Sequence, residues 1–221
     1  MKIIVINPNS SDEMTASIQQ SAEAYVQGRY EVETLSTPGA PVFIDYFEDH
    51  ALAAPGMIKI IEDYQDSADA FVIACHCDPN LHLLRQISKK PVIGIGEASM
   101  HMATMIGGRF TVLSTDKHSV THKQDIIHEY GLDHFCASVR ITDPTIEDSV
   151  EAYVDAAKKA MDEDYAEVIV LGCAGLCDLT NALRERIEAP VLDGVVCGLI
   201  QAEGLVNAGL TTSKVRLYAN R

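Results

Sequence analysis

The sequence predicts an α/β protein of two pseudo-symmetric lobes, each a parallel sheet flanked by helices, with a site in the cleft between them. Short apolar runs alternate with stretches of helical periodicity along all 221 residues. The runs are uniformly apolar, which is typical of parallel strands that are covered on both faces. One long stretch of the chain also resembles a later stretch, and this internal repeat predicts two related units.

The elements are expected in a regular order. The apolar runs predict strands at residues 2–7, 32–35, 69–74, 91–95, 110–114, 136–141, 167–172, 190–193 and 215–218. Helical spacing predicts helices at about 10–25, 51–65, 78–87, 98–106, 119–130, 145–161, 178–187 and 195–208. We expect residues 1–97 plus about 208–221 to form the first lobe and residues 98–207 to form the second.

Two helix starts carry recognisable capping signals. Ser10 and Glu13 have the spacing of a capping box, which opens the first helix. Asp78 suits an N-cap and Pro79 the first helical position, so a helix is expected to follow them directly.

The composition limits the classes of partner. The formal charge of −15 argues against binding to nucleic acid or to anionic membranes, because both need a basic surface. No apolar run reaches the roughly 20 residues of a membrane span, and the first residues do not resemble a secretory signal. We therefore expect a cytoplasmic protein whose six cysteines are thiols.

The internal repeat pairs two cysteines. Cys75 lies 16 residues before Pro91, and Cys173 lies 17 residues before Pro190. Each cysteine follows a buried strand and is followed by a polar turn, a leucine-rich helix and a Pro-Val strand. Each half also has a turn rich in hydroxyl or amide groups after an earlier strand.

The position of these residues predicts a shared site. Ligands of parallel sheets bind outside the carboxyl ends of the strands. Two similar lobes facing each other would place Cys75 and Cys173 on opposite sides of one ligand. Such a pair can exchange a proton at a carbon next to a carbonyl, one thiolate removing it and the opposite thiol returning one. The helix start after each cysteine is expected to lower its pKa and to offer N–H groups to an enolate oxygen.

Four motifs carry a resemblance to a known family. INPNSS near the start, ACxxDP, GIGEASMHMA and LGCAG occur in this order along the whole chain. The sequence resembles the hydantoin/allantoin racemase branch of the aspartate/glutamate racemase superfamily. The resemblance implies a two-lobed α/β fold, cofactor-independent racemisation by two cysteines, and a small ring or acid substrate held mainly by backbone amides.

The motifs assign roles to particular residues. The resemblance implies that Cys75 and Cys173 are catalytic, and further residues are expected to contact the substrate. These are Asn9, Ser10, His76, Cys77, Ser114, Thr115 and Ala174. Asp78 and Glu97 are expected to support the site from behind.

Some positions depart from the family pattern. His76 and Cys77 stand where the family usually has an aromatic and a small residue, and Asn80 stands where glycine is usual. Leu176 and Cys177 follow the second motif where methionine is common. These departures concern the part of the pocket that contacts the substrate rather than the catalytic cysteines.

Other polar residues have simpler interpretations. We expect His101, His118 and His122 to be surface or satisfied core histidines, although His118 follows a turn that could reach the cleft. The loop 39–50 is rich in aromatic residues, and it could cover the cleft or form a subunit contact.

The sequence thus favours a racemase of a 5-substituted hydantoin or allantoin, without cofactor or metal, and forming a homo-oligomer. A cysteine-dependent isomerase or decarboxylase of a dicarboxylic acid, or a racemase of aspartate or glutamate, is the alternative. A thiolate metal-binding protein using Cys75, Cys77, Cys173 and Cys177 is the non-enzymatic alternative, although their spacing is not that of a structural zinc site.

Overall fold

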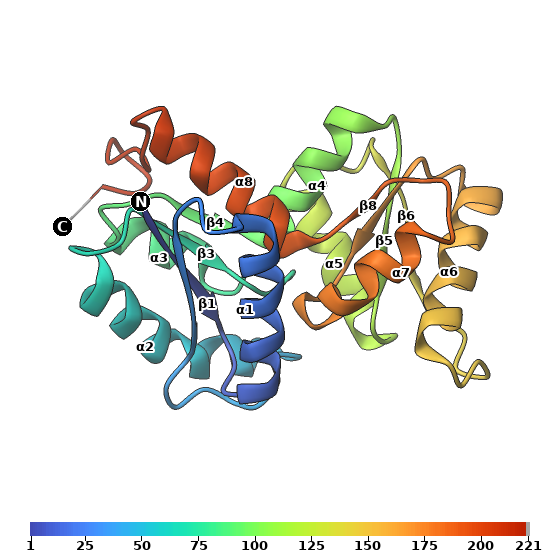
Figure 1. The fold of residues 1–221 in the computed structure, drawn as a ribbon, viewed down its shortest axis with the longest axis horizontal. Helices are drawn as coiled ribbons and strands as arrows, with labels where there is room; N and C mark the ends of the chain where they lie inside the picture. Colours follow the sequence, from blue (N-terminus) through green and yellow to red (C-terminus); the bar gives the residue numbers. More distant parts are fainter. Residues whose placement is uncertain (220–221) are drawn as a thin grey trace.

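The chain forms two four-stranded parallel sheets with helices on their faces, as the computed structural model shows (Figure 1). The strand orders are β2-β1-β3-β4 and β6-β5-β7-β8, so the same topology occurs twice. The structure describes residues 1–219, apart from the side chains of Cys177 and Asp178. The expected α/β fold with two related lobes is confirmed.

The elements follow the predicted order with small shifts at their ends. The strands are β1 Lys2–Asn7, β2 Glu31–Ser36, β3 Ala70–Ile73, β4 Val92–Gly94, β5 Phe110–Ser114, β6 Cys136–Ile141, β7 Val168–Leu171 and β8 Val191–Leu192. The helices are α1 Asp12–Val26, α2 Phe47–Tyr64, α3 Leu81–Ile87, α4 Ile95–Ile106, α5 His118–Glu129, α6 Ser149–Asp164, the 3₁₀ helix η1 Ala174–Leu179, α7 Thr180–Arg184 and α8 Gly194–Asn207.

β3 and β7, one inner strand from each sheet, are fully buried. β3 lies between β1 and β4, and β7 lies between β5 and β8. Their residues are apolar on both faces because helices cover both sides of each sheet. Since Cys75 and Cys173 follow β3 and β7 closely, the burial of these two strands fixes where both thiols lie.

Two helices connect the lobes. α4 packs against β5 and β7 of the second sheet, whereas α8 packs against β3 and β4 of the first (Figure 1). α4 and α8 also contact each other at the junction. The expected boundary placed residues 98–207 in the second lobe, but the contacts of α8 favour placing its residues with the first. We propose that the chain returns to the first lobe at Gly194.

Several local expectations were wrong. Residues 215–218 form no strand, because this part of the chain lies over α3, where Lys214 Nζ donates to the Arg85 carbonyl at 2.7 Å. The N-cap of α1 is Ser11 rather than Ser10, and its Oγ accepts from the Met14 amide. α3 begins at Leu81, after two residues in the left-handed backbone region, so Asp78 does not cap it.

Asn80 illustrates a departure from the family pattern that the backbone explains. Its φ angle is 61°, a conformation that glycine adopts freely and asparagine tolerates better than most residues. The Asn80 side chain also donates to the carbonyl of His50 at 2.7 Å. The substitution therefore keeps the turn and adds a contact to α2.

Candidate functional site

Cys75 and Cys173 line the same two small cavities, each of about 60 Å³. The thiols come from different lobes, and each lies just beyond the carboxyl end of its strand. The first cavity, here the Asn9 cavity, is lined by Asn7, Pro8, Asn9, Met14, Phe43, Ile44, Asp45, Ala74, Cys75, Cys173 and Ala174. The second, here the Lys123 cavity, is lined by Ile44, Asp45, Cys75, His76, Cys77, Thr115, Asp116, His118, Ser119, His122, Lys123, Gly172 and Cys173.

The structure brings most of the expected substrate contacts together. Asn9 and Ala174 line the Asn9 cavity. His76, Cys77 and Thr115 line the Lys123 cavity. The strand ends that the internal repeat singled out thus line the two cavities in both lobes.

Two expected contacts lie elsewhere. Ser10 is exposed and lines neither cavity, and its amide donates to the Pro41 carbonyl at 3.0 Å. Ser114 is fully buried, and its hydroxyl is hydrogen-bonded to that of Ser119. Ser10 therefore anchors the loop 39–50, and Ser114 holds the start of α5.

A lysine that the sequence analysis missed lies beside the thiols. Lys123 on α5 is buried, its ammonium donates to the Gly172 carbonyl at 2.7 Å, and it lies 3.9 Å from Cys77 Sγ. Lys123 precedes the buried Ile126 and Ile127 by three and four residues, so it occupies the apolar stripe of its helix. A charged residue on such a stripe was the available signal.

The Cys77 thiol is the more acidic of the two neighbouring thiols. A hydrogen bond from Cys75, together with the nearby charges of Lys123 and His122, lowers the pKa of Cys77. A buried ammonium needs a compensating anion, and among the described residues Lys123 forms no ion pair with a carboxylate. These surroundings favour the thiolate form of Cys77 beside Lys123.

The two expected catalytic thiols have higher pKa values. The hydrogen bond to Cys77 and burial raise the pKa of Cys75 well above its ordinary value. Burial also raises the pKa of Cys173, although a hydrogen bond from the Gly175 amide opposes this. The expectation that helix starts lower both pKa values was wrong, because burial and the neighbouring thiolate outweigh backbone N–H groups here.

His76 lines the Lys123 cavity and has two buried, unpaired ring nitrogens. It is 2% exposed, and neither ring nitrogen has a hydrogen-bond partner. Burial and the charge of Lys123 lower the pKa of His76 to about 3, so the ring is neutral. A neutral imidazole offers one donor and one acceptor, which suits an amide group of a ligand.

The loop 39–50 and α5 close the site from outside. Ile44 and Asp45 line both cavities, which places this loop over the thiols. His118 and His122 line the Lys123 cavity, so they are not simply surface or core residues as expected. The Tyr46 and His118 rings lie 4.5 Å apart between centroids and join the loop to the second lobe.

Asp78 supports the site by capping a distant helix. Its carboxylate accepts from the amides of Gly96 and Glu97, at 3.0 and 2.7 Å, and from the Tyr130 hydroxyl at 2.7 Å. Burial raises the pKa of Asp78 to about 7. A Cβ atom on Gly94 or Gly96 would lie 2.3 Å from the Asp78 carboxyl carbon or the His76 carbonyl, so the GIG sequence permits this close approach.

Glu97 has its own partner. Its carboxylate forms an ion pair with Arg85 on α3, and it lines neither cysteine cavity. His101 likewise lines neither cavity, and its Nδ1 lies 2.9 Å from the Glu97 carbonyl oxygen. The ACxxDP and GIGE motifs therefore meet at the start of α4, behind the cavities.

The described residues were also searched for metal ligands and membrane spans. Within residues 1–219, no cluster of three or more His, Cys, Asp or Glu side chains has an arrangement that could hold a metal ion. The Cys177 side chain, which the metal-binding alternative requires, lies outside the described ones. No helix in this part of the chain has both the length and the apolar character to cross a bilayer.

Two parallel sheets, with one thiol beyond a strand end of each, define a two-lobed α/β protein with a candidate site at the junction of its lobes. Comparisons with known proteins then identify the family. The Asp/Glu/hydantoin racemase family model matches residues 3–202. A hydantoin racemase from Rhizobium meliloti is 39% identical over 227 residues, which cover 99% of this chain and 94% of that protein. One from a Pseudomonas species is 36% identical over 226 residues, covering 99% and 91%.

A solved structure is similarly close. The allantoin racemase from Klebsiella pneumoniae superimposes with a TM-score of 0.93 at 34% identity, over 100% of this chain and 94% of that one. The chain therefore belongs to the Asp/Glu/hydantoin racemase family, and it is an isomerase of the racemase type.

Proposed function

We propose that this enzyme racemises a 5-substituted hydantoin or allantoin by two-base proton transfer between Cys75 and Cys173. The observation that carries the proposal is that both thiols, one from each lobe, line both cavities. The identity to hydantoin racemases and the likeness to allantoin racemase support this substrate class.

The proposed reaction is a 1,1-proton transfer. The thiolate of one cysteine takes the proton from C5 of the ring, and the electron pair of the broken C–H bond moves into the adjacent carbonyl to give an enolate. The thiol of the other cysteine then donates its proton to the opposite face of C5. One thiol and one thiolate are present before and after the reaction, but they have exchanged places.

Cys77 and Lys123 set the charge available for this exchange. Cys75 is the thiol that donates to the Cys77 thiolate. When Cys75 must act as the base, Cys77 can accept its proton, while Lys123 keeps the pair of sulfurs negatively charged. The nearby ammonium also favours the enolate electrostatically. The unpaired nitrogens of His76 are suited to bind a ring amide.

The test is racemisation of an enantiopure 5-substituted hydantoin in deuterated buffer. The optical rotation should decay to zero, and deuterium should enter position 5. The Cys75→Ala, Cys173→Ala double variant should show neither the decay of optical rotation nor the entry of deuterium. Cys136→Ala is the matched control, because Cys136 lines neither cavity. Full activity of the double variant would refute the proposal.

The substrate class needs a separate comparison. Hydantoins, allantoin, aspartate, glutamate and a dicarboxylic acid such as maleate should be assayed side by side. We expect turnover of a hydantoin or allantoin and none of the open-chain acids. Turnover confined to a dicarboxylic acid would support the decarboxylase or isomerase alternative instead.

A further inference from the structure

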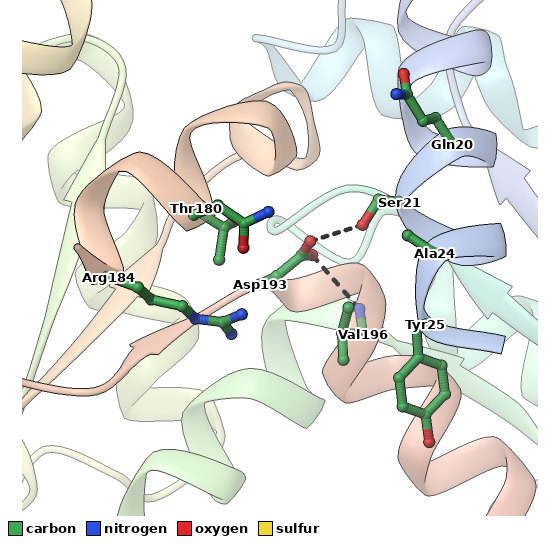
Figure 2. A pocket seen from close by; sticks show the side chains of 9 residues that line it. Gln20, Ser21, Ala24, Tyr25, Thr180, Arg184, Asp193 and Val196 are labelled. Carbon is green, nitrogen blue, oxygen red and sulfur yellow. Dashed lines mark hydrogen bonds between the residues drawn. The ribbon is translucent and has the colours of Figure 1, made fainter. Parts of the chain in front are cut away.

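A larger cavity of about 480 Å³ lies away from the cysteines, between α1, α7 and the start of α8. It is lined by Gln20, Ser21, Ala24, Tyr25, Thr180, Asn181, Arg184, Asp193 and Val196. None of these residues lines the Asn9 cavity or the Lys123 cavity. Figure 2 shows the Arg184 side chain reaching from α7 toward Asp193 and Val196.

The internal repeat shows that Arg184 lacks the carboxylate partner of its counterpart, Arg85. Arg85 in the first half donates through Nε to the Val92 carbonyl at 3.0 Å, and Arg184 donates to the Val191 carbonyl at 3.1 Å. Arg85 then pairs with Glu97, the third residue of α4. The third residue of α8 is Val196, so Arg184 has no carboxylate partner among the described residues.

A second difference leaves empty space. Asp193 caps α8 as Asp78 caps α4, by accepting from backbone amides in the first turn. Asp78 Oδ2, which also accepts from the Glu97 amide, accepts from the hydroxyl of Tyr130 at 2.7 Å. Asp193 Oδ2 accepts from the hydroxyl of Ser21 at 2.7 Å, as Figure 2 shows. The hydroxyl donor thus carries an aromatic ring in the first half and no ring in the second.

A third difference adds a polar group to the wall. Thr180, the first residue of α7, takes the place of Leu81, the first residue of α3. Thr180 is 4% exposed and lines the cavity, and its Oγ1 has no hydrogen-bond partner. A buried hydroxyl without a partner is costly unless a ligand or water satisfies it.

We propose that this cavity binds a small carboxylate with a planar, ring-sized body. The carboxylate would pair with Arg184 as Glu97 pairs with Arg85, and the planar body would fill the space that the Tyr130 ring occupies in the other half. The volume lies within the range of small-molecule sites. A planar guanidinium prefers a bidentate carboxylate partner.

The negative charge of Asp193 is offset in part. Its carboxylate is held by two backbone amides and the Ser21 hydroxyl, and it lies at the positive end of α8. In the first half, Glu97 lies near Asp78 and contributes to raising its pKa, and Arg85 is the cation that pairs with Glu97. The chain thus contains its own precedent for two carboxylates and one arginine at a helix start.

The test compares three probes by isothermal titration calorimetry with the full chain. Benzoate has both the ring and the carboxylate, acetate lacks the ring, and benzamide lacks the charge. We expect saturable benzoate binding. Benzamide should bind about fivefold more weakly, because it cannot form the charged pair with Arg184, an exposed residue of the cavity wall. Acetate should also bind more weakly, because it leaves the ring-sized space unfilled. Arg184→Met should weaken benzoate binding by about fivefold.

Val196→Glu is the decisive variant, because it supplies the missing partner from within the chain. It should abolish benzoate binding without lowering the thermal unfolding temperature of the unliganded protein. Should that variant not fold, Ser21→Tyr replaces it as the filling substitution. Arg186→Met is the matched control, since Arg186 pairs with Glu151 and does not line the cavity.

The outcomes separate cleanly. Weakened benzoate binding in Arg184→Met and loss of binding in a filling variant, with unchanged binding in Arg186→Met, supports the proposal. No saturable binding to the unaltered protein, equal binding of benzamide, or undiminished binding to the filling variant overturns it. None of these results depends on racemase activity.

Discussion

The ammonium of Lys123 lies 3.9 Å from the Cys77 sulfur and links a helix of the second lobe to the turn that follows β3 of the first. Lys123 also holds the Gly172 carbonyl, one residue before Cys173. One buried cation therefore contacts the strand ends that carry both Cys75 and Cys173. The Cys77 sulfur of this pair would supply the negative charge that the proposed proton transfer needs.

Replacing Lys123 should change the ionisation of Cys77. In Lys123→Met the lowered pKa of Cys77 should rise toward its ordinary 9.0, because one of the stabilising charges is lost while the Cys75 hydrogen bond remains. Ultraviolet absorbance of the thiolate across a pH titration measures this. Lys117→Met, an exposed lysine next to the same helix, is the control. An unchanged titration would show that Lys123 does not stabilise the thiolate.

Single cysteine variants should separate the two faces of the substrate. Cys75→Ala and Cys173→Ala should both lose racemisation by several orders of magnitude, because each lacks one of the two proton carriers. Each should still exchange the C5 proton of one enantiomer with deuterated solvent, and the preferred enantiomer should differ between the variants. Proton NMR of the separate enantiomers checks this. The same preference in both variants would contradict a two-base mechanism.

Asp78 should make stability depend on pH. Its folded pKa of about 7 exceeds the ordinary 3.8, so the folded protein holds a proton that the unfolded chain releases. The stability that this group contributes is complete below pH 3.8 and is lost as pH rises through about 7, by about 4 kcal/mol at most. Asp78→Asn should remove this dependence. Urea unfolding of both proteins across this window tests it, and parallel pH profiles would contradict it.

Gly96 should not tolerate a side chain. A Cβ atom there would lie 2.3 Å from the His76 carbonyl oxygen, so Gly96→Ala must displace the turn that carries the thiols. We expect a loss of about 1–3 kcal/mol in the free energy of unfolding. Gly204→Ala on α8 meets no atom within 4 Å and should be neutral or stabilising by up to about 1 kcal/mol. Equal effects in urea unfolding would mean that the close approach is not required.

The sequence predicted the sheets and the cysteine positions well, because both depend on short-range patterns. Buried strands such as β3 and β7 appear as uniform apolar runs, and the repeat marks the residues that follow them. Parallel topology then places the ends of these strands at one edge. The sequence was therefore sufficient to predict that Cys75 and Cys173 lie near each other, with no measured distance between them.

The missed features depend on contacts between segments far apart in the sequence. Asp78 caps a helix that begins 17 residues later, and no local pattern reports the left-handed turn that aims its carboxylate there. Asp45 reaches the cavities because the loop 39–50 is held by the bond from Ser10 to Pro41. Residues 215–218 look like a strand, but they lie over α3 rather than pairing with a sheet.

The passage of the chain between the lobes has a mechanical consequence. A Cβ atom on Gly194 would lie 3.2 Å from that of Ile95. With the proposed boundary, the chain leaves the first lobe at Ile95 and returns at Gly194. The second lobe would then be an insertion whose entry and exit are side by side, and these two backbone connections would form a single pivot. A molecule held beside Asp193 would sit one residue from that pivot.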